Sequence, residues 1–336
     1  MVILSRSIVE LIFLEHGRNT LLERLSDPFW FQSLGCVLGF DWHSSGLTTT
    51  VCGALKEALR DIGPEIGIYM AGGKGRTALR TPQEIELLSE KHSLRGELFV
   101  EISRLTAKVD SVLLQDGYQI YHHTIIFTKE GSWCVIQQGM NEEMGYARRY
   151  HWLGEKVDDF VEEPHSGISS QKLHEKILLN LTSRYSREAR NGIKELISDP
   201  EFLLKEIARI RVLNMPKRHY ILPGDLDIPR IKRTLSGIES GVINTFQDVL
   251  KLRGVGPKMM RALALVSELI YGMKPSFKDP ARYTFAHGGK DGHPFPVRRD
   301  IYDLTIDTLK RAIEKAKVGQ REKVEAIKRL SRILNE

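Results

Sequence analysis

The sequence predicts an α+β protein, with an amino-terminal mixed α/β domain that contains a β-hairpin, followed by a mostly helical domain. Residues 118–140, YQIYHHTIIFTKEGSWCVIQQGM, alternate apolar and polar side chains on both sides of a glycine turn, as a hairpin does. Apolar side chains recur at three- and four-residue spacing over 97–115, which is typical of the buried face of a helix. After residue 172 the pattern is mainly helical, apart from the Pro- and Gly-containing stretch 275–300.

The chain has 336 residues, enough for two domains that each bury their own core. Pro, Gly and Ser concentrate at 160–172, so we place a candidate catalytic domain at 1–165 and a helical domain at 166–336. The last segment carries an apolar stripe at Val324, Ile327 and Leu330, which predicts an amphipathic helix docked on the second domain.

Charge and cysteine content narrow the class of protein. A net charge of +6 and a pI near 9.1 favour an anionic partner such as nucleic acid. Cys36, Cys52 and Cys134 are odd in number and far apart, which excludes a disulfide framework and a CxxC zinc site. Neither a leader peptide nor a long apolar run is found, so we expect a cytoplasmic protein without a membrane partner.

The amino-terminal part should contain helices, a short strand and a glycine loop. Residues 27–39 and 48–63 have helical patterns, and Gly63 with Pro64 can stop the second of these helices. The stretch IGIYMAGGKGR reads as a buried strand that ends in a loop. A further helix should begin near Thr81, with Pro82 in its first turn and Glu84 placed for a capping box.

The most specific motif lies at 246–272, FQDVLKLRGVGPKMMRALALVSELIYG. A helix, a tight glycine turn and a second helix opened by a proline are typical of a helix-hairpin-helix. Free amides at the start of the second helix suit a phosphate oxygen, so Arg253, Gly254, Gly256 and Lys258 predict DNA binding through the backbone, without base readout. The alternative is a glycine turn between two core helices.

Two other stretches are candidate DNA contacts. Lys74 and Arg76 lie in the glycine loop AGGKGR, which lacks the ending of a nucleotide-triphosphate loop, and a simple surface turn is an equal alternative. Arg148, Arg149 and Tyr150 lie in YARRYHWLG, where arginines and aromatic rings alternate as they do in proteins that bind an unpaired strand. An interdomain packing element would have the same pattern.

The hairpin also suggests chemistry. Because neighbouring strand residues point to opposite faces, His122 and His123 cannot share one site, and each should share a face with one of Gln137 and Gln138. Asp41 and His43 are two apart in GFDWHSSG, and Asp116 stands just before the first strand. Carboxylates and imidazoles can hold a divalent cation or move a proton. The catalytic candidates are therefore Asp41, His43, Asp116, His122, His123 and Gln138, with Asp41, His43, Asp116 and His123 as metal ligands.

Each of these candidates has an ordinary structural alternative. A buried histidine hydrogen-bonded to a glutamine across a sheet is a common pair, and Ser44 or Ser45 can cap a helix. In the catalytic interpretation, Gln138 would orient His123 or the substrate. The loop FAHGGKDGHPFPV, residues 285–297, offers further polar side chains that could fold over a substrate, without a defined role.

Four long stretches carry a family resemblance: DPFWFQSLGCVLGFDWHSSGLTTT, YHHTIIFTKEGSWCVIQQGMN, ARRYHWLG and FAHGGKDGHPFPV. With these in order over almost the whole chain, the sequence closely resembles the archaeal and thermophile family known as domain of unknown function 763. The resemblance implies a repair-associated nuclease that cleaves DNA, with a metal-dependent amino-terminal domain and a helix-hairpin-helix behind it. Relatives usually begin with a further Gly- and Pro-containing stretch before the helix that here starts near Ser7.

The sequence therefore predicts a metal-dependent deoxyribonuclease that uses Mg²⁺ or Mn²⁺ to hydrolyse structured or partly single-stranded DNA in repair. One alternative is a DNA-binding or scaffold protein without catalysis. Another is a helix-hairpin-helix DNA glycosylase, in which Asp279 assists base removal. The oligomeric state stays open, with a homodimer among the options.

Overall fold

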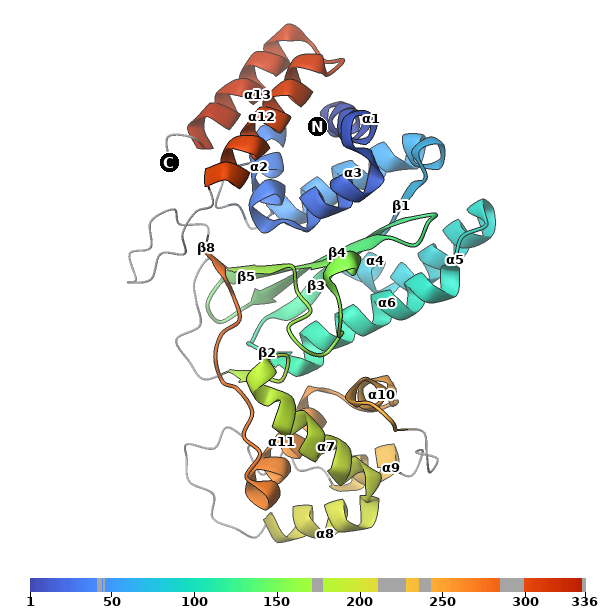
Figure 1. The fold of residues 1–336 in the computed structure, drawn as a ribbon, viewed down its shortest axis with the longest axis vertical. Coiled ribbons are helices and arrows are strands. Elements are labelled where there is room, and N and C mark those ends of the chain that lie inside the picture. The colour runs from blue at the N-terminus through green and yellow to red at the C-terminus, as the bar shows by residue number, and fades with distance from the viewer. Residues whose placement is uncertain are drawn as a thin grey trace.

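The structure is a computed structural model. It describes residues 1–40, 44, 46–170, 178–210, 228–235, 243–284 and 299–333. Within these ranges the fold is mixed α+β, as predicted. A sheet lies across the middle of the molecule, with helices on both of its faces (Figure 1). No helix in the described part of the chain is both long and apolar enough to span a membrane.

The sheet is built around the predicted hairpin. Its strands, in spatial order, are β1 (Ile68–Lys74), β3 (Gln119–Thr128), β4 (Trp133–Asn141), β5 (Tyr146–Leu153), β6 (Gly167–Ser170) and β8 (Tyr283–Thr284). All neighbours are antiparallel except β6 and β8. Two short strands, β2 (Leu114–Gln115) and β7 (Leu179–Asn180), pair separately. The hairpin register places His123 opposite Gln137 and His122 opposite Gln138, which confirms the expected alternation.

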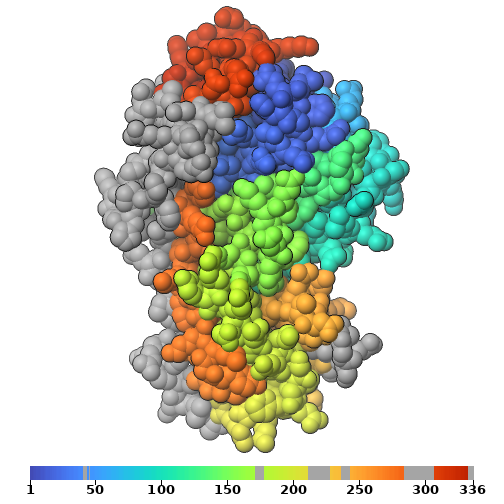
Figure 2. All heavy atoms as spheres, in the orientation of Figure 1, coloured from blue at the N-terminus to red at the C-terminus, as the bar shows by residue number. Residues whose placement is uncertain are grey.

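One face of the sheet is covered by helices from both ends of the chain. These helices are α1 (Val2–Ser26), α2 (Pro28–Leu38), α3 (Leu47–Ile66), α12 (Arg299–Lys315) and α13 (Gln320–Ile333). Leu309 and Ile313 of α12 and Leu330 of α13 are buried in one core with α1 and α2. The expectation that the last segment docks on the second half was therefore wrong. Its apolar stripe meets the amino-terminal helices instead, as the red and blue regions of Figure 2 show.

The other face is covered by a helical layer that continues into the helical part of the chain. Next to the sheet lie α4 (Arg76–Leu79), α5 (Thr81–His92), α6 (Gly96–Lys108) and the π-helical turn η1 (Val109–Leu113). Beyond them are α7 (Arg187–Ser198), α8 (Pro200–Ile210), α9 (Ile228–Leu235), α10 (Phe246–Lys251) and α11 (Pro257–Tyr271). The described residues also form two 3₁₀ turns, η2 (Gly154–Lys156) and η3 (Arg184–Ser186).

The two halves of the chain share one core on this face. Phe127 of the sheet and Leu263 of α11 belong to the same buried cluster. Strands β6 and β8 also come from beyond residue 165. Helix α11 packs against η1, and α10 packs against α6, so the apolar core on this face contains residues from both sides of the expected boundary at 165. The division into two domains stays a prediction.

Local details correct two further expectations. Helix α5 begins at Thr81 as predicted, but Thr81 Oγ1 donates to the Ala78 carbonyl and no capping box forms. Glu84 instead accepts from the Gly72 amide at 2.8 Å and pairs with Lys56. Helix α3 runs past Gly63 and Pro64 to Ile66 and ends at Gly67 in the left-handed conformation.

Candidate active site and nucleic-acid interface

The turn between α10 and α11 has a defined geometry. Thr245 and Asp248 form a capping box at the start of α10. Gly254 has φ +94°, and a Cβ atom there would lie 2.6 Å from Thr234 Oγ1, so both conformation and space require glycine. A Cβ atom on Gly256 would meet nothing within 4 Å. Pro257 begins α11, and the backbone just before it is therefore open to an approaching group.

Two side chains that flank η1, one at the end of α6 and one in β2, hold the turn in place. Lys108 Nζ donates to the Leu252 carbonyl at 3.1 Å, and Gln115 Nε2 donates to the Pro257 carbonyl at 2.9 Å. Arg253 and Lys258 are exposed on the turn. A fixed backbone with two exposed cations beside the amino end of a helix can bind an anion.

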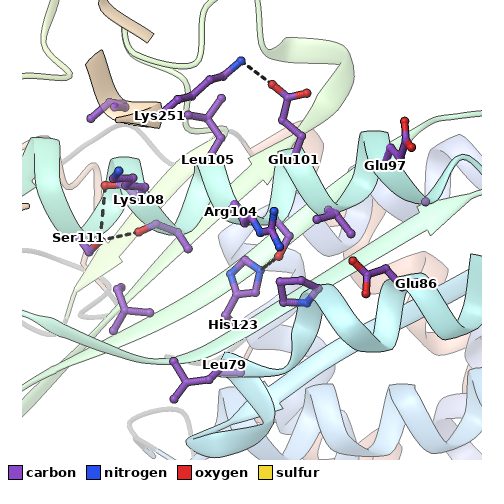
Figure 3. A pocket seen from close by; sticks show the side chains of 18 of the residues that line it. Leu79, Glu86, Glu97, Glu101, Arg104, Leu105, Lys108, Ser111, His123 and Lys251 are labelled. Atoms are coloured by element: carbon purple, nitrogen blue, oxygen red, sulfur yellow. Dashed lines mark hydrogen bonds and ion pairs between the residues drawn. The ribbon is translucent and has the colours of Figure 1, made fainter. Parts of the chain in front are cut away.

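A groove of 1590 Å³ adjoins α10 and runs along α6 (Figure 3). Its walls come from α4, α5, α6, the start of β3 and the end of α10. Charged side chains of both signs line it: Arg76, Arg104, Lys108, Lys251, Glu86, Glu90, Glu97 and Glu101. Arg76 is one of the expected DNA contacts, and its neighbour Lys74 is exposed above the Tyr121 ring, 5.8 Å from the centroid.

A polar pair lies where the groove meets the sheet. Ser103 Oγ of α6 is 2.8 Å from His123 Nε2, and both residues line the groove. His123 Nδ1 is 2.9 Å from Gln137 Oε1 on the neighbouring strand. Burial lowers the pKa of His123 below its usual value, although Gln137 and Asp110 oppose the shift. His123 is therefore a neutral imidazole at pH 7.

Asp110 of η1 anchors this chain of contacts inside the protein. Its Oδ2 accepts from Gln137 Nε2 and, at 2.9 Å, from Trp152 Nε1. Its Oδ1 contacts His165 Nε2. Ser103, Asp110 and His165 were not among the site residues expected from the sequence. Ser103 and Asp110 are seven residues apart, so they form a polar stripe beside the apolar face of the helix, and that spacing was the available signal.

The structure corrects the expectation about which glutamine contacts His123. Gln137 contacts His123, whereas Gln138 lies on the opposite face of β4 and donates to Tyr121 Oη. The expected role of Gln138 in orienting His123 was therefore wrong, because the strand alternation separates the two side chains.

His122 lies on the face of the sheet toward α3. Its Nε2 is 2.8 Å from Thr124 Oγ1, and its Nδ1 has no hydrogen-bond partner among the described residues. Burial lowers its pKa to about 3, and His123, Lys56 and Lys74 contribute in the same direction. The side chain is 1% exposed, so a direct catalytic contact would need movement of its surroundings.

Asp116 is held in a buried ion network. Arg148 Nη1 donates to Asp116 Oδ2 at 2.8 Å, and Tyr150 Oη donates to the same oxygen at 2.8 Å. Arg148 Nη2 donates to Asp279 Oδ2 at 2.6 Å. Asp279 and His165 also line a smaller cavity of 270 Å³. The network thus connects the sheet to the segment that follows α11.

Arg149 points to the other face of β5. Its guanidinium donates to Gln32 Oε1 at 3.1 Å, to Thr48 Oγ1 at 3.2 Å and to the Pro28 carbonyl at 3.2 Å. His151 accepts from its Nε at 2.7 Å. Burial lowers the pKa of Arg149 to about 9.

The expected strand-binding surface at 148–150 does not form. Arg148 and Tyr150 are fully buried and Arg149 is 4% exposed, so an unpaired strand cannot reach them in this conformation. The burial of the three residues fits the alternative interpretation of this stretch, an interdomain packing element. Acceptors on other elements bind both arginines.

The expected metal ligands are only partly described. Asp41 and His43 lie outside the described residues, as does the loop 285–297. Asp116 and His123 belong to separate hydrogen-bond networks and their acceptor atoms already have donors, so the two do not fit one shared ion. No group of three or more His, Cys, Asp and Glu residues that could hold a metal occurs in the described part of the chain. The metal site therefore stays a prediction.

Comparisons with known proteins give a family without an assigned activity. No curated protein and no solved structure matches the chain. The family profile described as "Protein of unknown function (DUF763)" matches residues 1–297, which include the sheet strands, the α10–α11 turn and both side chains of the Ser103–His123 pair. The chain belongs to the DUF763 family.

Proposed function

We propose that this protein binds DNA through the α10–α11 turn, without reading the base sequence, and hydrolyses a phosphodiester bond in the adjoining groove. The observation that carries the proposal is the turn itself, whose geometry supports its interpretation as a helix-hairpin-helix. It combines the required glycine at 254, open space at Gly256 and the exposed cations Arg253 and Lys258. Backbone amides of this kind bind phosphate oxygens and track either strand.

Two further observations support DNA as the ligand. Hydrogen bonds from Lys108 and Gln115 fix the carbonyl side of the turn, so little ordering should be required on binding. Arg76, from the glycine loop after β1, and Lys251, at the end of α10, line the same groove. A strand held at the turn would therefore have a neighbouring channel whose lining includes these two cations, of which Lys251 also pairs with Glu101.

The test of binding is Lys258→Ala, measured with duplex and single-stranded DNA of several sequences. We expect weaker binding to all sequences alike, and a slope of log K against log salt that is smaller by about 1, because one phosphate contact is lost. Lys328→Ala is the matched control, since Lys328 is an exposed lysine of α13, at the opposite end of the molecule in Figure 1. Equal salt slopes for both variants would contradict the proposed interface.

The test of hydrolysis uses branched, bubbled and single-stranded DNA with the whole protein. Incubation with Mg²⁺ or Mn²⁺, and in parallel with a chelator, separates metal-dependent from metal-independent cutting. Binding without any strand cleavage would favour the non-catalytic DNA-binding protein.

A glycosylase is the second candidate, and one observation favours it. Asp279 is held by Arg148 at 2.6 Å and by the Ala281 amide at 2.9 Å, on the wall of the 270 Å³ cavity. This aspartate is therefore fixed in position, which a carboxylate that assists base removal would need. Release of a free base from DNA whose backbone stays intact would favour this candidate over the nuclease.

A further inference from the structure

The hydrogen bonds of Gln137 determine which nitrogen of His123 carries the proton. Gln137 Nε2 faces the Thr106 carbonyl at 3.3 Å and the Asp110 carboxylate, which are both acceptors. The amide nitrogen must therefore point toward these groups, and Oε1 must point toward His123. Because Oε1 only accepts, His123 Nδ1 carries the hydrogen, and in the neutral ring the lone pair is on Nε2.

The Nε2 lone pair faces a hydroxyl group on the groove. Ser103 Oγ lies 2.8 Å from it, within the hydrogen-bond distance that nucleophile and base pairs adopt. From Ser103 inward, the contacts run through His123 and Gln137 to the carboxylate of Asp110. We propose that Ser103 and His123 form a nucleophile and general-base pair that attacks a DNA phosphodiester at the floor of the groove.

Several features of the surroundings favour an activated serine over an ordinary buried pair. Both side chains belong to the lining of a groove of 1590 Å³, where Ser103 is 2% and His123 is 4% exposed, so a phosphodiester reaches Ser103 Oγ only when the side chains around it move aside. Arg104 and Arg76 line the same groove, are exposed, and have no carboxylate partner within the described ranges. Guanidinium groups stabilise the negative charge that develops on a phosphoryl group under attack. Figure 3 shows Arg104 and His123 on the groove wall.

The reaction balances without an added reactant other than water. Ser103 Oγ forms a bond to phosphorus while the bond from phosphorus to the leaving sugar oxygen breaks. The Oγ proton passes to His123 Nε2, and the imidazolium then gives it to the leaving oxygen. In the second half His123 takes a proton from water, the hydroxide displaces Oγ from phosphorus, and Ser103 recovers its proton from His123.

This inference rests on the proposed function, since it names the groups that would cut the bound DNA. It also differs from the sequence-based expectation in its requirement for metal. An attack by Ser103 predicts cleavage that continues in the presence of a chelator, and a transient covalent link between the protein and the cut strand.

The first experiment labels the protein with a fluorophosphonate, a probe that phosphonylates activated serines. In the intact chain we expect modification of Ser103, located by peptide mass spectrometry. Ser103→Ala should abolish the labelling at this position, and His123→Ala should slow it by roughly 100-fold or more, because the general base is lost.

Ser111→Ala is the matched control, because Ser111 lines the same groove but donates to the Ala107 carbonyl at 2.7 Å and has no imidazole contact. This variant should be labelled like the wild type. If His123→Ala does not fold, Ser103→Ala still decides the question, since it removes one oxygen. Wild-type protein without modification at Ser103 would overturn the proposal.

The second experiment measures DNA binding and cleavage by Ser103→Ala. Unchanged binding with cleavage reduced at least 100-fold supports the nucleophile. Cleavage at the wild-type rate overturns it while the proposed function stands. Labelling of Ser103 in a protein that neither binds nor cuts DNA overturns the assignment to DNA, and in that case the proposed function fails as well.

Discussion

Arg148 and Arg149 are neighbours on β5, yet the sheet separates them into two different environments. Arg148 is bound by two carboxylates, those of Asp116 and Asp279. Arg149 faces α1 to α3 and donates to an amide, a hydroxyl, a backbone carbonyl and an imidazole. Both side chains are almost completely buried, so the difference lies in the charge of their partners.

The pKa values of the two arginines shift in opposite directions. Burial opposes the charge of Arg148, but Asp116, Tyr150 and Asp279 outweigh it and raise its pKa above the ordinary value. Burial dominates at Arg149 and lowers its pKa to about 9. A buried cation is thus tolerated in two ways, by compensating charge or by a shell of neutral acceptors.

The largest effect should follow from Arg148→Met. Removing the cation leaves the buried Asp116 and the half-buried Asp279 without their shared partner, which should cost about 3–5 kcal/mol of unfolding free energy. Urea unfolding of wild type and variant measures this loss. Arg60→Met is the control, because Arg60 is 70% exposed beside Glu57 and should change stability by less than about 1 kcal/mol. A similar loss of unfolding free energy in both variants would show that the Asp116–Arg148–Asp279 network does not stabilise the fold.

A smaller loss should follow from Arg149→Met. The substitution leaves acceptors such as Gln32 Oε1 without this donor, but among the contacts with described residues given above it strands no carboxylate, so we expect a loss of about 1–3 kcal/mol. The same urea unfolding assay applies. A larger loss of unfolding free energy for Arg149→Met than for Arg148→Met would contradict the view that charge compensation makes the two faces of the sheet different.

A third test measures how the unfolding free energy depends on pH, and it concerns His122, which lies on the same face of the sheet as Arg149. The pKa of His122 falls from 6.5 to about 3 on folding, so the unfolded chain binds this proton first. The stabilisation from neutral His122 is complete above pH 6.5 and is lost as the pH falls from there toward 3. Between neutral pH and about pH 5.5, His122→Asn should lose roughly 1 kcal/mol less unfolding free energy than the wild type. Equal losses in both proteins would show that His122 is not buried in its neutral form.

Local patterns predicted the elements whose determinants are local. The hairpin of β3 and β4 followed from period-two alternation and a glycine at 131, which the structure places at φ +112°. The helix expected over 97–115 is present as α6 and η1, although Leu98, one of the apolar residues of this stretch, is 40% exposed. Alternation also predicted that His122 and His123 would separate.

The features that the sequence analysis missed depend on distant partners. Arg148 meets Asp279, which lies 131 residues further along the chain, and no local pattern indicates that pairing. Without the partner, an arginine beside aromatic residues looks the same in a DNA-binding surface and in a core. The apolar stripe of α13 was recognised, but a stripe does not specify which surface it covers. Ser103 could not be recognised from the sequence, because a single serine in a helix is common and its contact with the His123 imidazole depends on another element.

The packing of α12 on α1 has a consequence for synthesis of the protein on the ribosome. Leu309 and Ile313 leave the ribosome long after the residues of α1 that they cover. At about 5–20 residues per second, the interval is roughly 15 to 60 s. During that time the apolar side of α1 lacks part of its final cover, so nascent chains of this protein are candidates for protection by a chaperone until translation ends.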